Sequence, residues 1–559
     1  MSSPLHICPV VRGVWFAAKE NPGFRTSLLE SFDEIQKPCV EGAAALLGAT
    51  VPLPYLSFFR RSGDRWVYFD EPLKNILNVF EQLKRPLVFQ LSCNHLIGPS
   101  PLVRDLLADP VNLMHFADGE PPHDDYLGLR VWPLTLVPDP DLPINRYRFI
   151  GLRRTLSILR NFHSRTRLVL GVTLYGEAHH LYADFKDGGG AEGNVKITDY
   201  SPASIRGFRR WLAVRYDDSL TLLNHQLESR FTDWEDIQPP RSGAPNSTLS
   251  CLDSYSHGMI PVEGWCSPME ELAAVEVWLD DYFAGRAKLK MSRPDVPENI
   301  HEISDLNTGF KLQLDFRTLS EGRHLLSVFA ITHDGRVAQI GERRIRILCA
   351  DKRAFTRSAP TCIQERGRPP KETYHHRLKF YLDSPSGNLE VIYNPLADLW
   401  YRYRCYQVES MLETMWGHAV ETGFPSESLF SHQIMIPFFG RRSELLYATD
   451  ATMRPQSRYN PGASLYGGQT VNPQIPALFH NRRYAVTEFH PLSASDPQVH
   501  SNALHLHQAA GACWVAPYFL SPRPPQRDDL AHRRFWIHSS NPHYGSDSLF
   551  RAIQQMCTR

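Results

Sequence analysis

The chain has 559 residues, of which 42% are hydrophobic, and this is enough for two or more domains with cores of their own. Its 60 Lys and Arg residues balance 60 Asp and Glu residues, so the formal net charge is zero. This balance excludes a strong electrostatic field that would draw the protein to nucleic acid or to an acidic membrane. We therefore expect a neutral ligand, with neither a nucleic-acid nor a membrane partner.

The N-terminal stretch 1–16 lacks the charged start and apolar core of a signal peptide. No apolar run approaches the roughly 20 residues that a membrane helix needs. The ten cysteines are scattered from Cys8 to Cys557 without a CxxC pair. This scatter is typical of reduced thiols and not of a disulfide scaffold or a zinc site. We therefore predict a cytoplasmic protein, with export by an unmarked route as the alternative.

Apolar, strand-like runs alternate with segments of helical period along most of the chain. The strand candidates are 10–16, 51–59, 86–93, 167–176, 431–439, 462–468, 484–489 and 512–520. The clearest helix candidates are 72–84, 149–163, 201–216 and 398–420, the third with Asp199 or Ser201 as its N-cap.

Eight strands in this alternation predict an α/β fold, a (β/α)8 TIM barrel. An open doubly wound sheet is the alternative, but residues 10–23 do not provide the G-x-G-x-x-G loop expected after its first strand.

Two polar, proline-containing stretches, 238–250 and 351–373, divide the chain. Between them lie short alternating segments with Asp-Gly or Glu-Gly turns, which predict a small β-sandwich. The wording VEVWLDD…GFKLQLDF…EGRHLLSVFAITHDG resembles the immunoglobulin-like modules of bacterial carbohydrate-active proteins. We therefore predict three parts: the first part of the barrel (1–250), an inserted immunoglobulin-like β-sandwich (255–350) and the second part of the barrel (351–559).

Two strand candidates end at a glutamate: the fourth runs into Glu177, and the seventh ends at Glu488. In a barrel the C-terminal ends of the strands meet at one cleft, so these side chains would face each other. Cleavage of a glycosidic bond requires one protonated carboxyl that donates to the glycosidic oxygen and one carboxylate that attacks or stabilises the sugar carbon. A rival carboxylate, Asp450, closely follows the fifth strand candidate and is interpreted as a turn residue.

This arrangement of glutamates on strands four and seven resembles clan A glycoside hydrolases. The segment TDYSPASIRGFRRWLAVRY (198–216) is similar to the helix that follows the acid/base strand in family 42-type β-galactosidases. The resemblance covers both predicted barrel parts. It implies a retaining O-glycosidase in which Glu177 is the acid/base, Glu488 is the nucleophile and Tyr466 hydrogen-bonds the nucleophile.

The sequence departs from the clan pattern at Gly176, where the clan has an asparagine that contacts the sugar 2-hydroxyl. We expect another residue, such as His179, to replace it. A different substrate, or a non-catalytic carbohydrate-binding or scaffold protein on a degenerate barrel, is the alternative.

Other polar or aromatic side chains near strand candidates are predicted to bind substrate through hydroxyl hydrogen bonds or an apolar ring face. They are Asn94, His95, His432, Gln433, His490 and Trp514. No metal or cofactor is predicted, because His505 and His507 fall on different helix faces and no HExxH motif is present. The predicted substrate is an oligo- or polysaccharide, with bacterial exopolysaccharide and β-galactoside as candidates. The sequence leaves open the linkage, the choice between hydrolysis and transglycosylation, and the oligomeric state.

Overall fold

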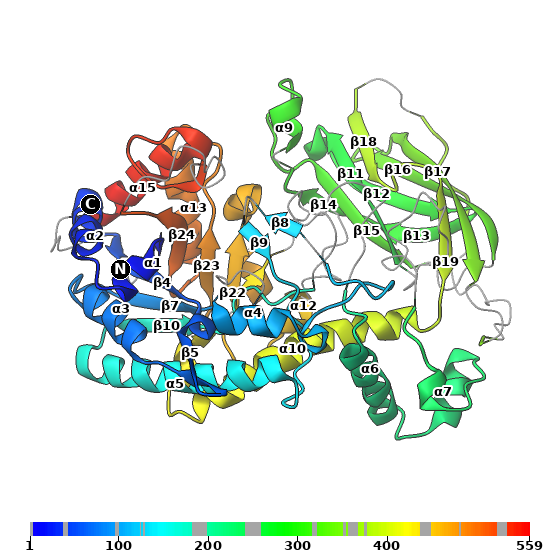
Figure 1. The fold of residues 1–559 in the computed structure, drawn as a ribbon. Helices are drawn as coiled ribbons and strands as arrows, with labels where there is room; N and C mark the ends of the chain where they lie inside the picture. The colour runs from blue at the N-terminus through cyan, green and yellow to red at the C-terminus, as the bar shows by residue number, and fades with distance from the viewer. Residues whose placement is uncertain are drawn as a thin grey trace.

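The computed structural model describes residues 4–36, 43–94, 100–122, 124–126, 129–180, 198–240, 259–293, 295–315, 321–349, 354–355, 367–373, 377–435, 449–473, 475–479, 482–522 and 534–558. An α/β part and a β part lie side by side (Figure 1). Within these residues, no helix combines the length and the apolar character required to cross a bilayer.

The α/β part is built on a parallel sheet that closes on itself. Its strands follow the order β20-β10-β7-β4-β2-β24-β23-β22-β21, and neighbouring strands pair in parallel. Only Ser431 and His432 separate β20 from β21, so the two ends of this order meet and the sheet forms a barrel. The strands are β1 (Leu5–Ile7), β2 (Val10–Val11), β3 (Ala45–Leu47), β4 (Ala49–Leu53), β7 (Leu87–Leu91), β10 (Val169–Thr173), β20 (Leu429–Phe430), β21 (Gln433–Ile434), β22 (Gly462–Leu465), β23 (Ala485–Phe489) and β24 (Val515–Leu520). The predicted α/β class with a parallel sheet is confirmed.

The barrel strands are apolar because both of their faces are covered, as is usual for parallel sheets. All five residues of β7 are buried, and so are all four residues of β22. Gln90, the polar residue of β7, donates from Nε2 to the carbonyl oxygen of Thr487 on β23 at 2.9 Å. This bond links the third and seventh strands of the barrel, and its acceptor Thr487 directly precedes Glu488.

Helices cover the outside of the barrel (Figure 1). Ser201 caps α6 by accepting a hydrogen bond from the backbone N–H of Ser204, and Pro202 occupies the first turn. The sequence-predicted strand at 10–16 is too long, because the backbone turns at Gly13 and a helix begins at Val14. The helices are α1 (Val14–Ala18), α2 (Pro22–Ile35), α3 (Glu71–Glu81), α4 (Pro101–Leu107), α5 (Pro143–Thr166), α6 (Pro202–Arg215), α7 (Leu220–Leu227), α10 (Ala397–Val420), α12 (Thr449–Thr452), α13 (Pro497–Ala509) and α15 (Ser546–Thr558).

Two short antiparallel hairpins also lie among the helices of the α/β part. One pairs β5 (Phe59–Ser62) with β6 (Arg65–Tyr68), and the other pairs β8 (Asp124–Tyr126) with β9 (Leu129–Val131).

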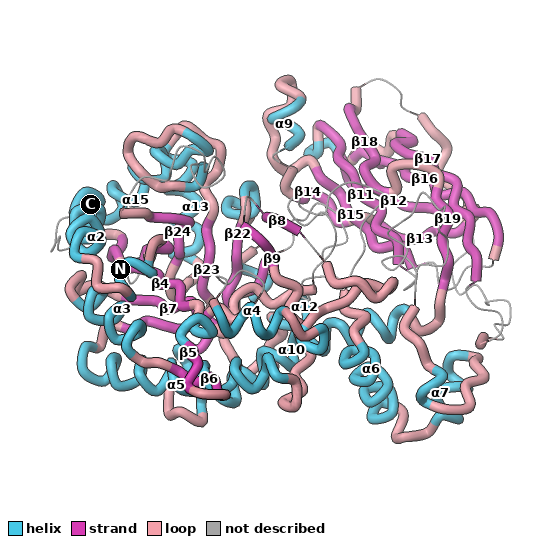
Figure 2. The backbone as a smooth tube through the Cα atoms, in the orientation of Figure 1, coloured by secondary structure: helices cyan, strands magenta, loops and turns pink. Residues whose placement is uncertain are grey.

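The β part consists of two sheets (Figure 2). One has the strand order β14-β15-β11-β18 and the other β13-β12-β16-β17-β19. The strands are β11 (Met259–Ser267), β12 (Leu272–Leu279), β13 (Tyr282–Arg286), β14 (Lys288–Met291), β15 (Gly309–Asp315), β16 (Gly322–Thr332), β17 (Val337–Cys349), β18 (Lys379–Ser384) and β19 (Leu389–Tyr393), with the helix α9 (Asp295–Asn299) after β14.

The predicted boundary of this part at residue 350 is too early. β18 pairs with β11, and β19 pairs with β17, so both strands complete the two sheets although they follow residue 350 in the sequence. The long polar stretch 351–373 suggested a domain boundary, but the chain returns to the sheets after it. An immunoglobulin-like relationship of the β part remains a prediction.

Candidate active site

Glu177 lies in a tight turn that follows β10. Tyr175 and Gly176 both have positive φ angles, 73° and 87°, the backbone region that favours glycine. A Cβ atom at position 176 would lie 3.0 Å from Nδ2 of Asn94. Both the backbone and this neighbour therefore disfavour an asparagine at position 176 in this turn.

Two predicted substrate-binding residues instead hold the backbone around Glu177. Asn94, which follows β7, donates from Nδ2 to the carbonyl oxygen of Glu177 at 2.7 Å. Gln433 accepts a hydrogen bond from the N–H of Ala178 at 3.3 Å and donates to the carbonyl oxygen of the same residue at 3.1 Å. These bonds fix the turn from two neighbouring strands. His95, also predicted to bind substrate, lies outside the described residues.

Glu488 lies on β23 between two histidines. Nε2 of His490 is 3.0 Å from Oε2 of Glu488, within hydrogen-bond distance, and Nε2 of His432 is 3.6 Å from Oε1. Nε2 of His432 also lies 2.8 Å from the hydroxyl of Ser464 on β22. His490, directly after β23, and His432, directly before β21, thus contact the Glu488 carboxylate on its two oxygens.

The structure brings the two glutamates into one site. One oxygen of Glu177, one oxygen of Glu488 and a ring nitrogen of His432 lie within 4.8 Å of one another. The hydroxyl of Tyr466 donates to Oε1 of Glu177 at 2.8 Å, and its ring stacks on His490 with centroids 4.1 Å apart. Both side chains are largely shielded from water, since Glu177 is 7% exposed and the Glu488 side chain 15%.

The surroundings push the acidities of the two carboxyl groups apart. Burial, together with the negative charge of Glu488, raises the pKa of Glu177 to about 8, and the hydrogen bond from Tyr466 offsets part of this rise. Burial also acts to raise the pKa of Glu488, but the hydrogen bond from His490 and the charges of His432 and His490 hold it below its ordinary value. Burial lowers the pKa of His432 and so disfavours its charged form. We therefore attribute the lowered pKa of Glu488 mainly to His490. At neutral pH the pair consists of a protonated Glu177 and an ionised Glu488.

Glu177, His432 and Glu488 are also the group of described side chains close enough to hold a metal ion. Imidazole and carboxylate ligands suit several first-row metals. A ligand must, however, be deprotonated to bind. In the absence of a metal the raised pKa of Glu177 keeps its proton in place at neutral pH, so a metal ion would have to displace this proton on binding.

Two other residues predicted to bind substrate are buried. His179 is buried, and its Nδ1 is 3.0 Å from the carbonyl oxygen of His180. Trp514 is fully buried at the N-terminal end of β24, where it packs against Phe430 with ring centroids 4.4 Å apart. Since the glutamates lie at or beyond the C-terminal ends of their strands, the prediction that Trp514 binds sugar is wrong. Its ring fills the opposite end of the barrel.

Sequence reasoning missed Tyr518, which lies four residues further along β24. Its ring lies 4.7 Å from that of His490, and burial, with added effects of both glutamate charges, raises its pKa to about 12. Arg12, directly after β2, acts on the same hydroxyl and lowers its pKa. Both residues belong to the site. Their position at the C-terminal ends of strands one and eight is the signal that could have identified them.

No protein-family model matches this chain, and no curated protein is significantly similar to it. Solved structures similar to it are TIM-barrel glycoside hydrolases. A β-galactosidase from the psychrophilic Marinomonas ef1 is 10% identical with a TM-score of 0.49, and the match covers 99% of this chain and 59% of that one. A β-galactosidase from Rahnella sp. R3 is 10% identical with a TM-score of 0.48, covering 100% and 55%.

The catalytic domain of a β-amylase from Paenibacillus polymyxa is 8% identical with a TM-score of 0.49, covering 97% of this chain and 100% of that one. The chain thus spans little more than half the length of the two β-galactosidases. With TM-scores below 0.5, this likeness carries no information on activity, which must be inferred from the site itself.

Proposed function

We propose that this protein is a retaining glycoside hydrolase in which Glu488 is the nucleophile and Glu177 is the general acid and base. The observation that carries the proposal is a buried pair of carboxyl groups, with oxygens within 4.8 Å of each other, whose pKa values are shifted in opposite directions. Retaining glycosidases place their carboxyl groups about 5–5.5 Å apart, whereas inverting enzymes need about 6.5–9.5 Å to admit a water molecule. The close spacing supports double displacement.

In the first step an oxygen of ionised Glu488 attacks the anomeric carbon of the sugar. The bond from this carbon to the glycosidic oxygen breaks, and the departing oxygen takes the proton of Glu177. The product is a glycosyl ester on Glu488 and a free alcohol. The raised pKa of Glu177 serves this step, because it keeps the acid protonated at neutral pH.

In the second step ionised Glu177 removes a proton from water, whose oxygen attacks the anomeric carbon and releases Glu488. Formation of the ester has by then removed the negative charge of Glu488. Since that charge raises the pKa of Glu177, its loss makes Glu177 more acidic and suits it to act as a base. A sugar hydroxyl in place of the water would give transglycosylation with the same residues.

The residues around the pair support catalysis over a degenerate, non-catalytic barrel. The turn at Gly176 disfavours the asparagine of the clan pattern, and the amide of Asn94 occupies the neighbouring space and fixes the backbone of Glu177. A buried carboxyl pair is costly to maintain, and the contacts of His490 with Glu488 and of Tyr466 with Glu177 hold this pair in place, as a catalytic pair requires.

A panel of aryl glycosides, including an aryl β-galactoside, tests the proposal with the wild type, Glu177→Gln and Glu488→Gln. Glu71→Gln is the matched control, because Glu71 is an exposed surface residue at the start of α3. The wild type and the control should release the aryl group, and both site variants should lose this activity. Activity of the wild type should survive EDTA, since no metal takes part. A wild type as inert as both variants would favour a binding role, and loss of activity in EDTA would favour a metal site.

A further inference from the structure

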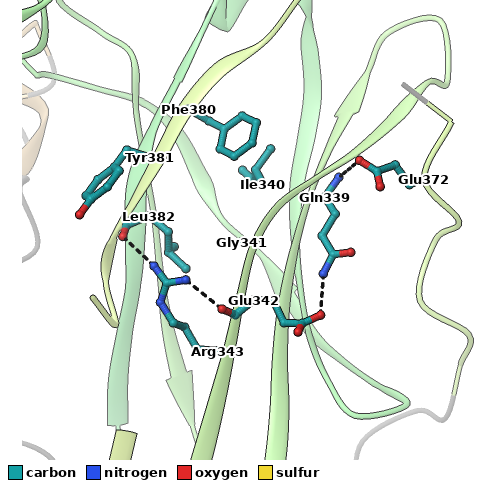
Figure 3. Close-up of a pocket in the computed structure, with 9 residues that line it drawn as sticks. All are labelled: Gln339, Ile340, Gly341, Glu342, Arg343, Glu372, Phe380, Tyr381 and Leu382. Carbon is teal, nitrogen blue, oxygen red and sulfur yellow. Dashed lines mark hydrogen bonds between the residues drawn. The ribbon is translucent and has the colours of Figure 1, made fainter. Parts of the chain in front are cut away.

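A second hollow lies in the β part, where the open edge of one sheet faces the other. β18 is the edge strand of the four-stranded sheet, and it lies against β17 of the five-stranded sheet (Figure 3). The hollow measures about 410 Å³, within the range of about 300–1,000 Å³ that is usual for small-molecule sites. It is lined by Gln339, Ile340, Gly341, Glu342, Arg343, Glu372, Phe380, Tyr381 and Leu382.

The floor of the hollow is shaped by a β-bulge in β17. The pairing with β16 shifts between Gly341, opposite Val328, and Gln339, opposite Phe329, so Ile340 is the extra residue. A Cβ atom at Gly341 would lie 2.7 Å from a terminal methyl group of Leu382, so a larger residue here would displace that side chain. Such bulges redirect side chains and are frequent next to binding sites.

The hollow combines one open aromatic face with fixed hydrogen-bond acceptors. Phe380 is 42% exposed, and its ring points toward Ile340 in Figure 3. Gln339 donates from Nε2 to Glu342 at 3.1 Å and from its backbone N–H to Glu372 at 3.4 Å. Each carboxylate accepts one of these bonds, and a carboxylate can accept several.

The guanidinium of Arg343 bonds backbone carbonyl oxygens beside the hollow. Arg343 donates from Nε to the carbonyl oxygen of Pro385 at 2.7 Å and from Nη1 to that of Glu342 at 2.8 Å. With two carboxylates, Glu342 and Glu372, and one guanidinium, Arg343, the lining carries one net negative charge. An anionic ligand is therefore disfavoured, whereas a neutral ligand rich in hydroxyl groups can donate to the carboxylates.

We propose that this hollow is a second saccharide-binding site, for an uncharged segment of the polymer that the barrel cleaves. The C–H face of a pyranose ring would pack on Phe380, and its hydroxyls would donate to Glu342 and Glu372. The choice of a saccharide as the ligand rests on the proposed function, whereas the existence of the hollow does not. The site holds the chain of sugars on the β part without taking part in bond cleavage.

Affinity electrophoresis of the full chain through gels containing galactan, arabinoxylan, glucomannan or mixed-linkage β-glucan tests this inference. All proteins carry Glu488→Gln so that the polymer is not degraded. At least one of these neutral polymers should retard the protein, and Phe380→Ala should weaken the retardation about five- to ten-fold, as expected for loss of one stacking contact. Tyr381→Ala is the matched control, because Tyr381 borders the hollow on the same strand and is 55% exposed, but its ring points away from the hollow in Figure 3.

The inference is overturned if no neutral polymer retards the protein, if Phe380→Ala is retarded as strongly as its parent, or if Tyr381→Ala loses as much retardation. Retardation by polygalacturonate alone would also overturn it, since that polymer is anionic. Hydrolysis of a small aryl glycoside, measured without the Glu488 substitution, should be the same in Phe380→Ala and the wild type. Retardation that depends on Phe380 in a protein without glycosidase activity would support this site and reject the proposed function.

Discussion

The substitution Tyr466→Phe tests the electrostatics of the site through the pH dependence of the reaction. The Tyr466 hydroxyl donates to Oε1 of Glu177 at 2.8 Å, and this bond stabilises the ionised form. Its removal favours the protonated form, so the pKa of Glu177 rises. A hydrogen bond to a charged group contributes about 1.5–3 kcal/mol. Since about 1.4 kcal/mol corresponds to one pKa unit, the expected rise is about 1–2 units.

The assay is kcat/KM for an aryl glycoside as a function of pH, which reports the ionisations of the free enzyme. The wild type should lose activity as the pH rises through about 8, where the acid Glu177 loses its proton. In Tyr466→Phe this alkaline limb should move to higher pH. The acid limb should move the same way, because Tyr466 also lowers the pKa of Glu488.

Tyr68→Phe is the control for loss of a buried hydroxyl, since Tyr68 bonds Thr155 at 2.8 Å on another part of the molecule. Its profile should match that of the wild type. An alkaline limb that stays in place or moves to lower pH in Tyr466→Phe would refute the reasoning, because Tyr466 would then not act on Glu177.

Three further predictions concern Glu177 and its neighbours. Glu177→Gln should slow the cleavage of glycosides with poor leaving groups by about 10²–10⁴-fold, the usual contribution of a general acid. It should affect the first step least for dinitrophenyl glycosides, because their leaving group needs no proton. An equal loss of rate for both kinds of glycoside would contradict the acid role. Glu177→Gln should also raise the melting temperature relative to the wild type at pH 8 more than at pH 5. The folded pKa of Glu177 lies above its ordinary value of 4.5, so wild-type stability falls as the pH rises from that value through about 8. A gain of about 1 kcal/mol in the free energy of unfolding corresponds to a rise in melting temperature of about 2–4 °C for a domain of 150–250 residues. If differential scanning calorimetry shows the same rise in melting temperature at both pH values, the pKa of Glu177 is not raised. Asn94→Ala should lower kcat about ten-fold with little change in KM, as expected when about 1.4 kcal/mol of orientation is lost; a change confined to KM would show that Asn94 contacts substrate directly.

The pairing of Glu177 with Glu488 follows from sequence because barrel geometry is periodic. Each strand candidate delivers its last residue to the same rim, so two glutamates at the ends of strands four and seven must face one cleft once the sheet closes. The apolar runs that predict the barrel strands are buried on both faces, as β7 and β22 show. The helix at 201–216 was equally readable, because Ser201 and Pro202 mark its start.

What the sequence did not reveal depends on contacts between distant segments. Asn94 and Gln433 both carry amide groups of the kind that bind sugar hydroxyls. Only the fold shows that these amides hydrogen-bond the backbone of residues 177–178. Trp514 and Tyr518 lie on one strand, and their roles depend on which end of the barrel each residue occupies. The return of β18 and β19 to the β part was hidden by the polar stretch before them.

A covalent trap tests the central claim most directly. A 2-deoxy-2-fluoro glycoside of the best aryl substrate slows release of the glycosyl ester, so the labelled peptide can be mapped by mass spectrometry. We predict that the fluorosugar is attached to Glu488, with one sugar per chain, and that Glu488→Gln takes up none. A label on another residue would contradict nucleophilic attack by this carboxylate. So would a protein that turns over the parent glycoside and is completely inactivated by the fluorosugar without carrying a label.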